Sequence, residues 1–278
     1  MNSLPKYFKY LEQMFFLWDL PRYGIRAKLL QPFKGGGKTH NIPFVDNNIT
    51  YKFTVDIEPL DDDCLHISIV NPTQDECVTV YVYPKTSVAI LHNISYFNNC
   101  AKEGLQPATG TILLKFIISY LRRHKELLKI NRIALTDHSF LKCNYCDETV
   151  KLARLRMVTK EAPWYMAHGF RPFDARKNKP DDKALISLQA NNESLNTMKT
   201  NIIDIISIAK SLNKYDMNEL QRLINKYPLF RDFVIRLNSE YNKYCCLISH
   251  ILEDVFNRSF PQEVLLYDFF DKTFYMDI

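Results

Sequence analysis

Apolar and polar positions follow different periods in successive parts of this chain. Near the start, Phe8, Leu11, Phe15 and Trp18 recur at helical spacing, which predicts an amphipathic helix over about residues 5–18 that ends before Pro21. The residues after this helix contain the densest group of Gly and Pro in the chain. They predict an irregular stretch that lasts to about residue 50.

The central part of the chain has the periodicity of strands. Segments rich in β-branched and aromatic residues lie at 51–57, 64–70 and 77–83, separated by turn-forming stretches, and predict an antiparallel meander. A fourth strand is expected over about 87–97. The most helix-like run follows at 108–129, with one apolar stripe and a basic end that suits a helix C-terminus.

A further strand at 132–137, a helix at 149–159 and a strand or loop at 164–174 complete the central part. This order of elements predicts an α/β (α+β) fold with a mixed sheet, whose last strands are joined by right-handed crossovers. Residues 177–183 are polar and predict a linker, and almost all of the remaining chain predicts helices.

We therefore expect three parts. Residues 1–50 form an N-terminal helix and an irregular segment that packs on the core, 51–176 form the α/β domain, and 185–278 form a separate helical domain. Apolar residues occur on almost every side of the C-terminal helices, so these helices must be buried against several neighbours. The expected core of this domain is Phe230, Phe233, Leu237, Leu247, Ile251 and Phe256.

Composition excludes some classes of protein. The chain has 278 residues, 46% of them hydrophobic, and its net charge of +5 is spread without a basic block, so no nucleic-acid partner is evident. It contains neither a signal-like segment nor an apolar run long enough to cross a membrane, which predicts a soluble intracellular protein without a membrane partner. In such a compartment the seven cysteines are expected to be free thiols.

Residues 35–39, Gly-Gly-Gly-Lys-Thr, are similar to the end of a phosphate-binding loop. The Walker pattern requires a Gly at the position that Pro32 occupies, and the preceding residues form a poor strand. A flexible basic loop is the better interpretation.

The spacing of Cys143 and Cys146 is that of half a structural zinc site. The neighbouring sequence lacks the other half, and Cys245 and Cys246 would point in different directions from a helix. His138 is close in the sequence, so a metal site formed by Cys143, Cys146 and His138 is an open alternative. We expect no metal and favour free thiols.

Two segments carry a resemblance to a known family. NCAKEGLQPATGTILL, residues 99–114, leads into the long helix, where unpaired amides can bind a pyrophosphate. Tyr165 lies four residues before Gly169 and Phe170. In this order, the two segments resemble the pyrophosphate loop and the Tyr-x-x-x-Gly-Phe turn of the acyl-CoA-dependent N-acetyltransferase (GNAT) superfamily. The resemblance extends from Tyr51 to Phe173, and the same region is similar to uncharacterised acetyltransferase-like proteins of large DNA viruses.

The resemblance implies a GNAT-like, mostly antiparallel sheet flanked by helices, to which the C-terminal helical region is added. It implies acetyl-CoA as cofactor, held by the splay between the fourth and fifth strands and by five residues at the helix entry: Gln106, Ala108, Thr109, Gly110 and Thr111. A helix that merely begins at a Thr-Gly turn is the structural alternative.

The implied reaction is direct attack of an unknown amine on the thioester. Tyr165 would protonate the departing thiolate, and His66, Asp137 and His138 are candidates for the general base. The structural alternative for Tyr165 is a ring that packs the sheet edge. The alternative function is a catalytically silent fold that serves as a viral structural or interaction component and binds a protein partner through the C-terminal helices.

Overall fold

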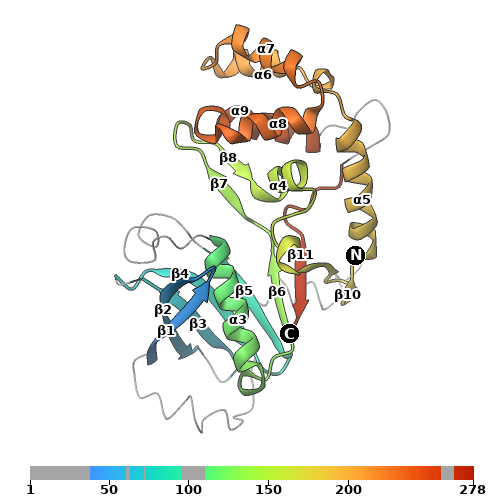
Figure 1. The fold of residues 1–278 in the computed structure, drawn as a ribbon. Coiled ribbons are helices and arrows are strands. Elements are labelled where there is room, and N and C mark those ends of the chain that lie inside the picture. Colours follow the sequence, from blue (N-terminus) through green and yellow to red (C-terminus); the bar gives the residue numbers. More distant parts are fainter. Residues whose placement is uncertain (1–37, 61–62, 72, 95–109, 258–265) are drawn as a thin grey trace, which may run out of the picture. The chain divides into compact units, whose positions relative to one another are not determined.

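The computed structural model describes residues 38–60, 63–71, 73–94, 110–257 and 266–278 (Figure 1). These described residues divide into two compact units. The first contains those from 38 to 135, Ala175–Asn178 and Tyr275–Ile278, and the second contains those of Thr136–Asp174 and from 179 to 274. In this division the C-terminal helices share a unit with residues that follow Leu135. The expected N-terminal helix lies outside the described residues.

The first unit is built on an antiparallel meander in which each strand pairs with the next. Its strands are β1 (Lys38–Asp46), β2 (Ile49–Pro59), β3 (Leu65–Val70), β4 (Glu76–Tyr83) and β5 (Val88–Ile94). Strands β2 to β5 confirm the predicted ones. β6 (Arg132–Thr136) then pairs with β5 in parallel, so the sheet is mixed, as predicted.

β1 replaces part of the expected irregular stretch, and Lys38 and Thr39 lie on this strand instead of in a loop. The hairpin turn to β2 uses Asn47 and Asn48 at φ values of 49° and 64°, a conformation that Asn tolerates and that matches the twist of paired strands. Pro43 misled the sequence interpretation, since a proline is compatible with a strand at the edge of a sheet.

Helix α3 (Gly110–Leu128) covers one face of the meander (Figure 1). Its predicted apolar stripe is buried, and the ring of Phe116 stacks on Phe53 of β2 at a centroid distance of 4.3 Å. Lys115 forms an ion pair with Asp46 at 2.9 Å at the margin of this contact. Apolar burial on one side and solvated charge on the other hold the helix on the sheet.

The second unit begins with a hairpin, β7 (Phe140–Lys142) and β8 (Thr149–Lys151), which runs directly into α4 (Leu152–Lys160). The predicted helix at 149–159 therefore starts three residues later than expected, after β8. The 3-10 helix η2 (Met166–His168), β9 (Arg171–Asp174) and β10 (Lys179–Pro180) follow.

The prediction of a linker at 177–183 is wrong. Asn178, at a φ of 50°, turns the chain from β9 into β10, and the Asp181 carboxylate accepts the Ala184 N–H at 3.1 Å as N-cap of the next helix. Polar residues here serve a turn and a helix cap, which have the same composition as a linker.

The C-terminal helices are α5 (Asp182–Thr197), α6 (Ile205–Leu212), α7 (Met217–Lys226), α8 (Phe230–Ser239) and α9 (Tyr241–Asn257), with the 3-10 helix η3 (Thr200–Ile202) between α5 and α6. All six residues predicted for their core are at most 4% exposed, which confirms that prediction. None of the described helices combines the length and the apolar character that a membrane crossing needs.

The prediction of an all-helical C-terminal region is wrong at residues Thr273–Asp277, which form the strand β11. This strand lies between β6 and β9 in the strand order. Ile278 N–H donates to Asn131 O at 2.9 Å and Asp137 N–H donates to Lys272 O at 2.9 Å, so β11 runs antiparallel to β6. The described chain is thus an α+β protein with a large, mostly antiparallel sheet.

Candidate functional site

The predicted Tyr-x-x-x-Gly-Phe segment forms a tight turn in the second unit. Gly169, at a φ of 91°, ends η2, and its N–H donates to Met166 O at 3.1 Å. The Phe170 N–H donates to Tyr165 O at 3.2 Å. A residue with a Cβ would be strained at this φ, so Gly169 is required by the turn that sets the ring of Tyr165 against those of Phe170 and Phe274.

Tyr165 is buried, with 7% of its surface exposed. Burial, and to a lesser extent the charge of Asp137, raise the pKa of its phenol well above the ordinary value of 10. The phenol therefore keeps its proton throughout the neutral range.

Asp137 directly follows β6 and is completely buried. Its Oδ1 accepts the Ser139 N–H at 3.0 Å and the Ser139 hydroxyl, whereas Oδ2 has no hydrogen-bond partner among the described residues. Burial raises the pKa of this carboxyl to about 6, although the Ser139 hydrogen bonds oppose the rise. The negative charge of Asp268 also raises the pKa of Asp137.

Asp268 belongs to a network around Arg154 of α4, which is 4% exposed. Arg154 Nε and Nη2 donate to Asp268 Oδ2 at 2.9 and 2.6 Å, Nη1 donates to Glu253, and Nη2 also donates to Asn257 at 3.2 Å. The sequence interpretation missed this network. The available signal was Arg154 itself, a charged residue within the apolar face of a short helix.

A buried carboxyl with a raised pKa, in electrostatic interaction with a buried phenol, is an arrangement suited to proton transfer. Asp137 can accept a proton near neutral pH, and Tyr165 holds one to give. These two predicted residues lie in the same unit and interact electrostatically.

His66 lies on β3 in the other unit. Its Nδ1 is 2.9 Å from Glu58 and its Nε2 is 3.4 Å from Glu76, while its ring stacks on Tyr81. Both ring nitrogens face carboxylates, which favours a structural role, and its role as a base stays a prediction.

Of the residues predicted to hold coenzyme, Gly110 and Thr111 form the first turn of α3. Gln106, Ala108 and Thr109 lie outside the described residues. The strands that precede and follow this helix in the sequence are β5 and β6. They pair at three positions: Val88 with Arg132, Ala89 with Ile133 and Ile90 with Ala134. Beyond the last pair, β5 continues to Ile94 and β6 to Thr136.

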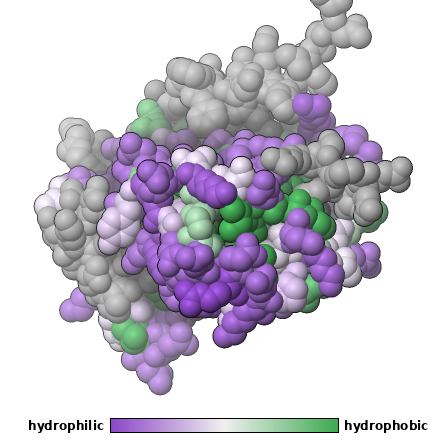
Figure 2. Space-filling view, turned by 90° about the horizontal axis from the view of Figure 1, so that it is seen from above, coloured by the Kyte–Doolittle hydropathy of each residue, from purple (hydrophilic) through white to green (hydrophobic). Residues whose placement is uncertain are grey.

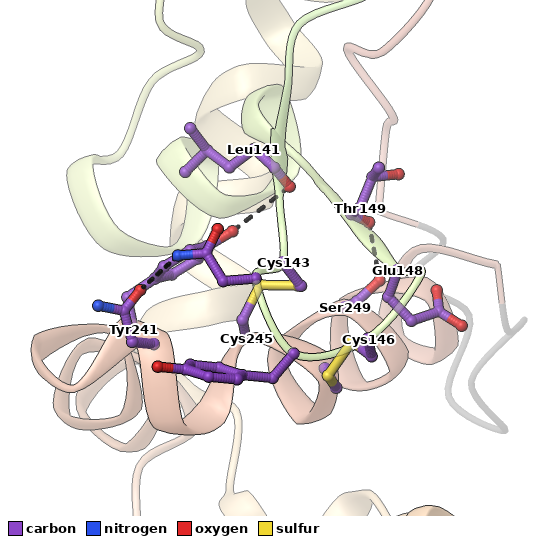
Figure 3. The surroundings of a disulfide bond; sticks show 12 residues. Leu141, Cys143, Cys146, Glu148, Thr149, Tyr241, Cys245 and Ser249 are labelled. Carbon is purple, nitrogen blue, oxygen red and sulfur yellow. Dashed lines mark hydrogen bonds between the residues drawn. A yellow bond between two sulfur atoms is a disulfide. The ribbon is translucent and has the colours of Figure 1, made fainter. Parts of the chain in front are cut away.

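The cysteines of the hairpin and of α9 are joined by two disulfides, Cys143 to Cys245 and Cys146 to Cys246, with Cα separations of 5.7 and 6.5 Å (Figure 3). The prediction of free thiols is wrong for these four residues. The hairpin β7–β8 reaches α9, so that adjacent helix positions each meet one hairpin cysteine. His138 is mostly exposed and lies 3.4 Å from Asp271.

Comparison with known proteins finds no matching family model, no matching curated protein and no matching solved structure.

Proposed function

We propose that this chain is a GNAT-like, acyl-CoA-dependent N-acyltransferase that moves an acetyl group to an amine by direct attack. The observation that carries the proposal is the short parallel pairing of β5 with β6, which ends after Ile90 and Ala134 although both strands continue. Backbone groups at the carboxyl end of a parallel pair are the usual binding position in open α/β sheets. Here they offer hydrogen bonds to an extended pantetheine arm.

A bulge in β5 supports the same interpretation. Thr79 pairs with Asn93 and Val80 with Leu91, so His92 is an extra residue at this end of the strand. A bulge bends its strand and increases the local twist, and thereby turns backbone groups away from a neighbouring strand. The N-terminus of α3, which follows β5 in the chain, supplies amides for the pyrophosphate of the same coenzyme.

In the proposed reaction the amine nitrogen attacks the thioester carbonyl and the carbon–sulfur bond breaks. Asp137 accepts the proton that the amine loses, and Tyr165 donates a proton to the thiolate that leaves. A base whose pKa is about 6 is mostly ionised at neutral pH, and the buried phenol is protonated there.

Coenzyme binding is the first test. Isothermal titration with acetyl-CoA should give saturable heat for one molecule per chain. Gly110→Val should abolish this heat because a branched side chain at the start of α3 blocks close approach of the pyrophosphate. Ser119→Val adds the same side chain at an exposed position of the same helix and should leave binding intact. Absence of heat up to millimolar acetyl-CoA would refute the proposal.

Tyr165→Phe should keep the fold and coenzyme affinity but lower the turnover rate about 100-fold or more, which is the scale for a lost general acid. Steady-state release of free CoA thiol measures this rate with any accepted amine. Tyr120→Phe is the matched control, because burial also raises the pKa of Tyr120, to about 12, in a helix that supplies no reacting group. An unchanged rate in Tyr165→Phe would assign the residue to packing.

The alternative function is that of a catalytically silent fold that serves as a viral structural or protein-interaction component. Apolar residues at the surface favour this function. In α5, η3 and α8, Ile186, Ile202 and Ile235 are 70%, 49% and 43% exposed. Figure 2 shows an apolar area with hydrophilic residues along part of its margin. A chain that takes up no coenzyme but purifies with a stoichiometric protein partner would support this alternative.

A further inference from the structure

The four cysteines Cys143, Cys146, Cys245 and Cys246, here called the cysteine cluster, lie closer together than two separate cross-links require. The sulfur atoms of Cys143, Cys146 and Cys246 all lie within 4.8 Å of one another, and Cys245 is bonded to Cys143. One sulfur of the first disulfide therefore lies within 4.8 Å of both sulfurs of the second. Two cross-links that serve only to join a hairpin to a helix could lie apart.

We infer that, when its thiols are reduced, the cysteine cluster binds one zinc ion through four thiolates. Zinc prefers tetrahedral sites, and thiolates are its most frequent structural ligands in proteins. A Zn–S distance of about 2.3 Å places the sulfurs of a tetrahedron about 3.8 Å apart. Three of the sulfurs, those of Cys143, Cys146 and Cys246, are already within 4.8 Å of one another, near that spacing. The fourth ligand, Cys245, is bonded to Cys143 and has to rotate its side chain towards the other sulfurs when that disulfide opens.

The hairpin supplies the first pair of ligands in a form that zinc sites use. Cys143 lies just after β7, and its N–H donates to Glu148 O at 3.1 Å, which closes the turn that carries Cys146. The strands on either side have three residues each, too few for an independently stable hairpin. Such a hairpin needs a fixed attachment, and a metal at its tip provides one.

The second pair of ligands is held in place by contacts that do not involve sulfur. The Tyr241 hydroxyl donates to Leu141 O at 3.4 Å, and the Ser249 hydroxyl donates to Thr149 O at 2.8 Å (Figure 3). His250 lies 3.4 Å from Glu148. These contacts fix both strands of the hairpin on α9 on either side of the cluster, so the four sulfurs stay together after the disulfides are opened.

Burial and charge suit a structural site. Cys143, Cys245 and Cys246 are at most 5% exposed, and protein sulfur fills all four positions, which leaves no open position for a substrate. Four thiolates around one Zn²⁺ carry a net charge of −2. Lys214, whose Nζ donates to Tyr145 O at 3.1 Å in the turn, brings a positive charge to this end of the hairpin.

Metal binding here involves protons and no electrons. Each of the four thiols releases one proton to the solvent as its sulfur binds zinc. The two disulfides are the oxidised form of the same residues and have no thiolate to offer, so the zinc-bound and disulfide forms exclude each other. Zinc must therefore be sought in protein kept reduced.

The test uses the full chain, produced in zinc-containing medium and purified with a phosphine reductant. Elemental analysis should find one zinc per chain. Cys146→Ser and Cys246→Ser, one from each ligand pair, should each reduce that content at least tenfold. Cys64→Ala removes a buried cysteine of the other unit and should keep one zinc. Reduced protein without zinc, or with equal zinc in all three variants, would overturn the inference.

Because a cysteine variant can fail to fold, the unaltered chain gives a second measurement. Replacement of zinc by Co²⁺ should produce the intense visible bands of a tetrahedral site together with thiolate-to-cobalt charge transfer. A chelator should then make four more thiols per chain reactive towards a disulfide reagent. Octahedral cobalt bands, or a thiol count that the chelator does not change, would contradict the site.

Discussion

Arg154→Met should lower the free energy of unfolding of the second unit by about 1–3 kcal/mol, the cost of leaving partly buried charged groups without their hydrogen-bond partner. Arg154 is 4% exposed and binds Asp268, Glu253 and Asn257 through its guanidinium group. Methionine keeps much of the length of the side chain but loses the guanidinium group that lies over the ring of Phe256, and it leaves Asp268 without this partner. Without Arg154, the negative charge of Asp268 would also repel the ionised carboxylate of Asp137 more strongly.

Urea denaturation followed by the fluorescence of Trp164 measures this effect. Trp164 lies in the second unit, and Trp18→Phe as background removes the other tryptophan of the chain. Arg236→Met is the matched control, because Arg236 forms its ion pair with Glu240 at the surface, and it should unfold like the parent. If the two substitutions cost the same, the Arg154 network is not a stabilising element.

Asp137→Asn should make the second unit more stable at pH 7, by up to about 3 kcal/mol relative to the parent. Burial raises the pKa of Asp137 from 3.8 to about 6 in the folded protein. A raised folded pKa gives stability that is complete below the unfolded pKa and is lost as the pH rises through the folded pKa. The parent therefore loses this contribution between about pH 4 and pH 6.

The asparagine variant keeps an oxygen that accepts the Ser139 N–H but has no charge to bury. The difference in unfolding free energy between variant and parent, measured by urea denaturation from pH 4 to pH 8, should grow through that window and then stay constant. Asp182→Asn, at an exposed position of α5, should follow the parent at every pH. A pH-independent difference between Asp137→Asn and the parent would show that Asp137 does not titrate there.

Local periodicity in the sequence was sufficient for much of the fold. Strands β2 to β6, helix α3 and the buried core of the C-terminal helices were predicted from residues that are near neighbours in the chain. Tyr165 and Gly169 were likewise found by spacing, because a tight turn is a local structure. In these cases the positions that decide the outcome lie within about one turn or one strand of each other.

Features that join distant parts of the chain were decided only by the tertiary structure. The sequence showed Cys143 and Cys146 as half of a site, and their partners lie 102 and 100 residues further on. The pairing of β11 with β6 and the Arg154 network connect residues at similar separations. Periodicity contains no information about which distant segments meet, because that depends on the path of all the chain between them. The sequence by itself therefore determined the elements and their buried faces, whereas the tertiary structure decided which polar and sulfur-bearing residues share a site.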